Sequence, residues 1–386
     1  MNRRNIYLMY LISFLQGMVF YAPIATLYRR AQGVSVFEIS LIETVFMLLC
    51  LGLEIPWGIV ADRIGYRRTV VLCSIGYFAT KVIFWQATDF WGFLLERVLL
   101  AVVIAGLSGV DTTLVYLSCK GQDSQKVFGV LDSCGTAGLL LASAVYSLWI
   151  GQNYALAGFL TVVSYGAAAV LSLGLCEVGQ MSSQEKDSPV PKESFRSTLV
   201  SVFSRRELLV FLAGVALLSE SHQMITVFLN QLQYQRCGMD DRAIGFAYLL
   251  VSVVGLLGGW SAWVSRRGGI HRTGRWFYLS AAALCLLLTF TESAVLSVAA
   301  ILLLKLVYTL FVPMQTQLQN QMITVQNRAT ALSINAMLVD LFSGGANLLF
   351  GGAAQRDLRL ALLLGALFCA AGCGCFEYWW HKSEQR

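Results

Sequence analysis

Four ionisable side chains lie within long apolar runs and are the residues best placed to do chemistry. They are Glu220, Asp340, Lys305 and Asp111. Placing an ionised group in hydrocarbon costs about 2.5–3.5 kcal/mol on insertion scales, so such a group usually faces a cavity or a partner. The chemistry open to these four residues is reversible protonation and ion pairing.

Glu220 is the strongest candidate for proton exchange. It lies at the centre of the apolar run 207–233, where desolvation disfavours the charged form of a carboxyl group. The alternative is a neutral, hydrogen-bonded carboxyl group with a purely structural role. His222 follows two positions later and faces another side of the helix, so it is the weaker candidate.

Lys305 and Asp340 lie near the middles of the tenth and eleventh apolar runs. If the two helices are neighbours, these side chains can form an ion pair at membrane depth. A pair that opens in one state is a coupling device, whereas a permanent pair is structural. Glu43 and Lys81 lie nearer to the outer side, and we interpret them as rim charges.

The elements that must position these groups are apolar helices. The chain is 57% hydrophobic and 13% charged, against about 45–50% and about 25% in ordinary soluble domains. Runs of roughly 20 residues with almost no charge recur along the chain, as is typical of transmembrane helices. We therefore predict an all-α integral membrane protein with twelve transmembrane helices.

Basic residues concentrate in alternate loops of this predicted topology. Under the positive-inside rule, this distribution places both termini in the cytoplasm. We expect the membrane to be the inner membrane of the cell. It also accounts for the net charge of +6, so we expect no nucleic-acid partner.

Metal, redox and ATP chemistry find no support in the sequence. The cysteines lie mostly within the apolar runs, where cysteine behaves as a small apolar residue, and no Cys-x-x-Cys pair is present. The three histidines are scattered, and no phosphate-binding Gly-Lys-Ser/Thr loop occurs. We expect no enzyme activity, no catalytic residue, no metal and no cofactor.

A polar segment divides the apolar runs into two sets of six. We predict an N-terminal six-helix bundle over 1–178, a cytoplasmic linker over 179–206 and a C-terminal six-helix bundle over 207–386. The sequences PWGIVADRIGYRR and GGWSAWVSRRGG echo each other at the ends of the second and eighth runs, which indicates two pseudo-symmetric halves. Such repeats are common in secondary transporters.

A charged loop motif follows the second run. It consists of Gly58, Asp62, Arg63, Gly65, Arg67 and Arg68. The motif resembles the loop signature of the major facilitator superfamily, and the predicted helix layout extends the resemblance over the whole chain. The segment GLSGVDTTLVY, residues 106–116, is similar to small bacterial efflux-type members.

The resemblance implies that the loop motif forms an inner latch between the halves. Asp62 would face the N-terminus of the eleventh helix, whose partial positive charge favours an anion. Gly65 permits a tight turn, while Arg67 and Arg68 can pair with acids or lipid headgroups. Asp111 either lines the cavity or pairs with Arg67 in this latch.

Polar and aromatic residues of the first, seventh and eleventh runs are candidates for a substrate cavity. They are Tyr10, Gln16, Tyr21, Asn230, Gln233 and Asn335. Aromatic walls with a few amides suit an amphipathic organic solute. The alternative for each aromatic residue is packing or a place in the interfacial belt.

The resemblance implies a secondary active transporter that works by alternating access. We expect a monomer in the lipid bilayer that exports a hydrophobic or amphipathic small molecule, with a proton gradient as the energy source. The fifth run lacks the proline that antiporters of the family usually carry, which weakens the export interpretation. The alternatives are uptake or uniport of a small metabolite and, less favoured, a membrane sensor without transport.

Overall fold

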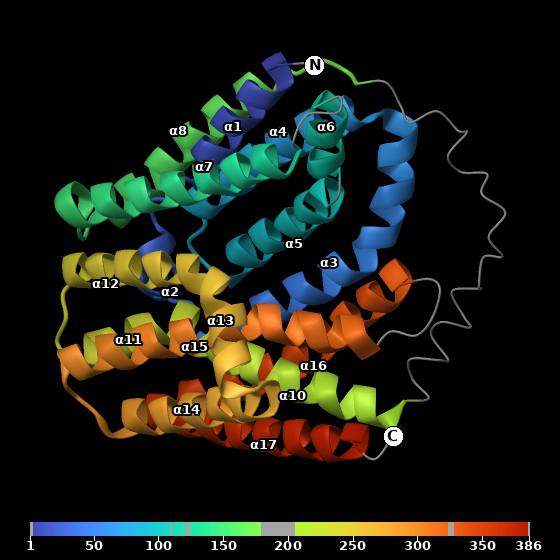
Figure 1. Cartoon of the computed structure of the whole chain (residues 1–386). Coiled ribbons are helices and arrows are strands. Elements are labelled where there is room, and N and C mark those ends of the chain that lie inside the picture. Colours follow the sequence, from blue (N-terminus) through green and yellow to red (C-terminus); the bar gives the residue numbers. More distant parts are fainter. Residues whose placement is uncertain (1–2, 109, 120–123, 179–204, 323–327, 385–386) are drawn as a thin grey trace, which may run out of the picture. The chain divides into compact units, whose positions relative to one another are not determined.

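The chain is described here from a computed structural model, which covers residues 3–108, 110–119, 124–178, 205–322 and 328–384. Every regular element in these ranges is a helix (Figure 1). The N-terminal helices are α1 (Arg3–Gly17), η1 (Ala22–Ile24), α2 (Ala25–Ala31), α3 (Val36–Ile64), α4 (Tyr66–Gln86), α5 (Phe90–Leu107), α6 (Val110–Cys119), α7 (Ser124–Val145), η2 (Tyr146–Ile150) and α8 (Tyr154–Ser172). The C-terminal helices are α10 (Arg206–Gln223), η4 (Met224–Leu229), α11 (Asn230–Arg236), α12 (Asp241–Val254), η5 (Gly255–Trp260), α13 (Ser261–Gly268), α14 (Ile270–Phe290), α15 (Ala294–Met322), α16 (Arg328–Arg356) and α17 (Leu358–Glu384).

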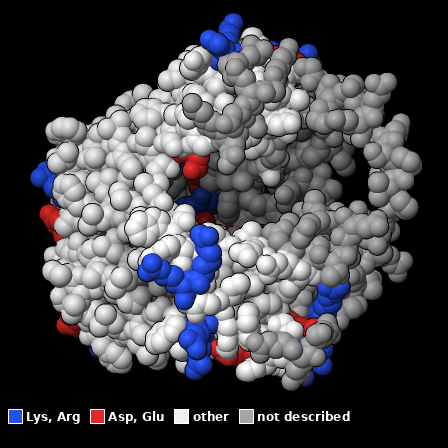
Figure 2. Space-filling model, viewed as in Figure 1, with Lys and Arg blue, Asp and Glu red and all other residues white. Residues whose placement is uncertain are grey.

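Twelve helical segments in the described ranges are long and apolar enough to cross a membrane. This number confirms the prediction from the apolar runs. Uncharged side chains also dominate the described surface in Figure 2, as expected of a chain whose solvent is largely lipid. The chain is therefore a multi-pass membrane protein.

The helices form two compact units. The first comprises Met1–Val34, Val45–Pro189 and Asp241–Leu249, and the second comprises Ser35–Thr44, Val190–Asp240 and Leu250–Arg386. The start of α3 thus belongs to the second unit and the start of α12 to the first. In the first unit, the Tyr154 hydroxyl donates a hydrogen bond to the Asp241 carboxylate at 2.7 Å and ties α12 to α8. The predicted linker lies outside the described residues except for its last two positions.

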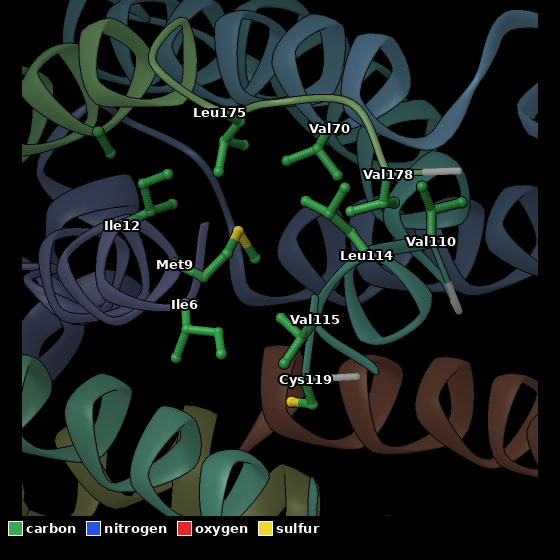
Figure 3. Packing of buried hydrophobic residues seen from close by; sticks show 11 residues of the cluster. Ile6, Met9, Ile12, Val70, Val110, Leu114, Val115, Cys119, Leu175 and Val178 are labelled. Carbon is green, nitrogen blue, oxygen red and sulfur yellow. The ribbon is translucent and has the colours of Figure 1, made fainter. Parts of the chain in front are cut away.

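The first unit has an apolar core beside the loop motif (Figure 3). Helix α1 contributes three side chains, α6 contributes four, and the rest come from α4, α8 and the segment after α8. The cluster is Ile6, Met9, Ile12, Val70, Val110, Leu114, Val115, Cys119, Ala168, Leu175 and Val178. This packing holds α1, α4 and α6 around the cavity described below.

Glycines bring α1 and α7 into backbone contact. A Cβ atom at Gly138 would overlap the carbonyl oxygen of Phe14, and one at Gly17 would overlap the carbonyl oxygen of Gly135. Small residues allow such close approach in membranes, where dispersion contacts rather than hydrophobic burial drive helix association. The α1–α7 contact therefore depends on the absence of these side chains.

We expect Gly138→Ala to destabilise the first unit by about 1–3 kcal/mol, because the added methyl group meets backbone rather than a movable side chain. Thermal unfolding of the purified protein in one detergent measures the effect. Gly129→Ala is the matched control on the same helix, since nothing lies within 4 Å of its Cβ position. Equal unfolding temperatures for the two variants would contradict the close-contact interpretation.

Candidate functional site

The loop motif spans the end of α3 and the start of α4. Gly65 has φ of +98° and directly precedes α4, so it makes the turn that the sequence predicts. Gly58, Asp62 and Arg63 belong to α3, but their side-chain surroundings lie outside the described part of the chain. The predicted contact of Asp62 thus stays a prediction.

Arg67 binds the segment after α8 within the first unit. Its guanidinium donates hydrogen bonds to the carbonyl oxygens of Leu173, at 3.1 Å, and Leu175, at 2.5 Å. Its backbone N–H donates to the Glu177 carboxylate at 3.3 Å. Both accepting carbonyl groups follow Ser172, the last residue of α8, so Arg67 supplies donors to the segment that directly follows this helix. Arg68 is exposed.

We expect Arg67→Gln to lower the stability of the first unit by about 1–2 kcal/mol, because the charged donors to the segment after α8 are lost. Arg68→Gln removes the same charge from the neighbouring exposed position and serves as the control. Thermal unfolding in detergent compares the two variants. A larger loss for Arg68→Gln would show that loop charge, rather than the contact with the segment after α8, stabilises this region.

The first unit contains a cavity of about 490 Å³. Asp111 of α6 and Gln16 of α1, both predicted site residues, line it together with Tyr77 of α4 and Tyr165 of α8. The sequence left two alternatives for Asp111, lining the cavity or pairing with Arg67. In the structure Asp111 lines the cavity, and Arg67 instead binds the segment after α8. Serine and threonine hydroxyls and aliphatic side chains complete the lining.

Asp132 of α7 also lines this cavity, and the sequence reasoning missed it. A helical pattern points to it, because Asp132, Gly135, Thr136 and Leu139 follow the spacing i, i+3, i+4, i+7 and all line the cavity. That spacing marks one face of α7. The signal in the sequence was that Asp132, a charged residue, lies on the same face of α7 as Gly135.

A buried set of charges lies behind the two tyrosines. The Lys81 Nζ atom is 3.9 Å from the Glu96 carboxylate, which is also 3.7 Å from Arg97 Nε. The side chains of Lys81 and Glu96 are only 7% and 1% exposed. Lys81 Nζ also lies 5.7 Å and 5.1 Å from the ring centroids of Tyr77 and Tyr165. Lys81 is thus a buried, paired charge, and its interpretation as a rim charge was wrong.

Tyr10 and Tyr21, which were also predicted to line a cavity, do not line this one. Tyr21 is buried and stacks on Phe84 with ring centroids 4.0 Å apart. Tyr10 meets Tyr7 edge to face. The structure gives Tyr21 the packing position that was its alternative.

Glu220 is the centre of a polar cluster in the second unit. Its side chain is 2% exposed and accepts a hydrogen bond from the Asn347 amide, while its Oε1 atom has no hydrogen-bond partner in the described ranges. The carboxyl groups of Glu43 and Asp340 lie close enough to act on it electrostatically. Of these carboxyl groups, Glu220 and Glu43 are buried, whereas Asp340 is exposed.

His222 lies beside this cluster at the end of α10. Its ring stacks on Tyr308 with centroids 3.8 Å apart, and its Nε2 atom lies 3.0 Å from the Thr226 hydroxyl. The π-helical turn η4 begins two residues later. Such π-helical turns are often found at functional sites.

Lys305 does not pair with Asp340. No ion pair among the described residues includes Lys305, and its charge acts instead on His222. Of the two predicted residues, Asp340 belongs with the carboxyl cluster of Glu220. The predicted ion pair is therefore absent from this structure.

We expect the losses of unfolding free energy caused by Lys305→Met and Asp340→Asn to add in the double variant, because the two side chains form no ion pair within the described chain. Unfolding of all three variants in one detergent measures the losses. A double variant that is more stable than either single variant would reveal a coupling between the two side chains.

The predicted amides of the second unit have different surroundings. Gln233 donates to the Thr291 carbonyl at 3.1 Å and to the Ser297 hydroxyl at 3.0 Å, so it has a packing role instead of a cavity position. Asn230 is buried and accepts from the Gln231 backbone N–H. Asn335 is fully buried, and neither atom of its amide has a partner within the described chain. Asn335 thus remains available to a ligand or water.

Metal-type clusters are absent from the part of the chain that the structure describes. No three His, Cys, Asp or Glu side chains are arranged there to hold a metal ion. The cysteines of the described residues are unpaired.

Comparison with known proteins adds a family pattern and two similar folds. The pattern of the Major Facilitator Superfamily matches residues 6–346. The chain is 26% identical over 161 residues to the multidrug resistance protein MdtG of Yersinia enterocolitica; the match covers 40% of this chain and only 38% of that relative.

Both similar folds are crystal structures. The nucleoside transporter NupG has a TM-score of 0.82 at 16% identity, with 98% of this chain and 99% of that chain covered. A bacterial homolog to the human lysosomal transporter Spinster has a TM-score of 0.77 at 14% identity, with 97% and 95% covered. At such identities the likeness concerns the fold alone.

Proposed function

Because the chain belongs to the Major Facilitator Superfamily, and is therefore a membrane transporter rather than an enzyme, we propose that it is a proton-coupled exporter. In this proposal it works by alternating access and moves a hydrophobic or amphipathic small molecule out of the cell in exchange for protons. The family and the fold carry the transporter assignment. Residues of the two units support the proposed proton coupling and the proposed substrate class.

Glu220 is the observation that carries the proton coupling. It is buried, has one oxygen without a hydrogen-bond partner among the described residues, and lies near two further carboxyl groups. A carboxyl group in such surroundings gains from taking up a proton, since the neutral form escapes both desolvation and repulsion. Its charge therefore responds to its surroundings, as a coupling group requires.

The cavity of the first unit supports a small amphipathic substrate. Its 490 Å³ falls within the about 300–1,000 Å³ that is usual for small-molecule sites. Aliphatic side chains and two tyrosines can hold an apolar body, and Gln16 and the hydroxyls can orient a polar group. The name of the partial relative, a multidrug resistance protein, favours export.

Uptake of a small metabolite is the second candidate. The similar fold of a nucleoside transporter favours it. So does α7, which has glycines but no proline where exporters of the family usually carry one. Proteoliposomes with an imposed proton gradient of either sign distinguish export from uptake by the direction of net substrate movement.

The cellular setting completes the proposal. We place the chain in the inner membrane, and both termini in the cytoplasm because basic residues concentrate in the loops on that side. In this proposal it works as a monomer, needs no cofactor beyond the proton gradient and binds no nucleic acid.

We expect Glu220→Gln to reduce gradient-driven flux to the level of protein-free liposomes while substrate binding stays measurable, because glutamine keeps the shape but cannot exchange a proton. Glu207→Gln is the control, since it neutralises a carboxyl group at the start of the same helix. Flux and equilibrium binding are measured on the same preparations. Unchanged flux in Glu220→Gln would overturn proton coupling through this residue.

A further inference from the structure

We infer that the cavity of the first unit binds an organic amine in its ammonium form, held by the carboxylates of Asp111 and Asp132. The inference rests on the proposed function, because it names the substrate class of that transporter. The described residues that line the cavity all belong to one unit, and the helices that contribute to the lining are α1, α4, α5, α6, α7 and α8.

The charge of the lining is the first argument. Asp111 and Asp132 both line the cavity, and no lysine or arginine is among the described residues that line it. Within the described chain, neither aspartate forms an ion pair. Asp111 Oδ1 accepts the backbone N–H of Thr112 at 2.6 Å, which leaves its other oxygen available. Two carboxylates without a basic partner favour a cationic ligand and repel an anion.

The nearest buried cations do not cancel this charge. Lys81 lies against the rings of Tyr77 and Tyr165, and Glu96 stands between it and Arg97. None of the three charged side chains lines the cavity. The tyrosine rings therefore lie between this set, which is two cations and one carboxylate with one net positive charge, and the acidic cavity.

An unpaired hydroxyl is the second, independent argument. Ser74 lines the cavity, is 1% exposed, and its Oγ atom has no hydrogen-bond partner among the described residues. A buried polar group without a partner is costly, so a native site usually supplies one. An ammonium group has several N–H donors and can serve the two carboxylates and this oxygen together.

The apolar residues of the lining indicate what kind of body the ligand has. Met9, Ile12, Val70 and Leu107 offer aliphatic surface, and Tyr77 and Tyr165 offer ring edges and faces. No group of three His, Cys, Asp or Glu side chains in the described ranges is arranged to hold a metal ion. The ligand is thus an amine with an apolar, preferably aromatic, body.

Equilibrium binding to the full chain in nanodiscs, without any gradient, tests the inference. The probes are phenylbutylamine, phenylbutanol and phenylbutyrate, which share one body and differ in the charge of the head. We expect the amine to bind at least about tenfold more tightly than the alcohol, and the carboxylate not to bind measurably.

Variants assign the effect to the two aspartates. Asp111→Asn and Asp132→Asn are each expected to weaken amine binding about tenfold and to leave the alcohol unchanged, which also reports a folded cavity. The charge-retaining Asp111→Glu and Asp132→Glu should keep most of the amine affinity. Asp89→Asn, which neutralises a carboxyl group of the same unit outside the cavity and keeps a helix-capping side chain, should change nothing.

Equal binding of the three probes, or amine affinity that both asparagine variants leave intact, would overturn the inference. These outcomes leave the proton-coupling test of Glu220 untouched, because binding is measured without a gradient. Conversely, selective amine binding with no gradient-driven flux would overturn the proposed function and keep the amine site.

Discussion

The absence of water around the spanning segments is the constraint on which the rest of this structure depends. Each backbone polar group must find its partner inside the chain, which leaves helices as the regular element. The same constraint places Glu96 between Lys81 and Arg97 and surrounds Lys81 with tyrosine rings. A polar group that remains unpaired, such as the Ser74 hydroxyl, is therefore informative in a way that it would not be at a wet surface.

The fold was largely predictable because lipid imposes a strong pattern on sequence. Apolar runs and loop charge predicted the twelve spanning helices, and the spacing around Gly65 predicted the turn before α4. The partner of Arg67 was not predictable. It binds backbone carbonyl groups in the segment after α8, and backbone acceptors carry no residue type by which a sequence reveals them. The assignment of the starts of α3 and α12 to opposite units likewise depends on packing alone.

The sequence predicted how deep each candidate residue lies in the membrane, but not which neighbouring helix its side chain faces. A position along a run indicates how deep a residue lies, and in this way Glu220 and Asp111 were found. Rotation of each helix about its axis decides which side chains meet, and this is why Asp340 lies near Glu220 and forms no described ion pair with Lys305. Gln233 shows a second limit, since a buried amide satisfies a neighbouring carbonyl group as readily as a ligand. Asp132 became visible only when the face of α7 was known.

The backbone contact between α1 and α7 limits how this protein can change over evolution. Gly17 lines the cavity and also forms that contact, because a Cβ atom there would overlap the carbonyl oxygen of Gly135, so no larger residue fits at this position without separating the helices. New ligand preferences must therefore arise at neighbouring positions such as Gln16 and Thr136, whose side chains are free to vary in size and polarity. The size of the residue at this lining position therefore stays constrained as the protein evolves, and changes in ligand preference are confined to the other lining positions.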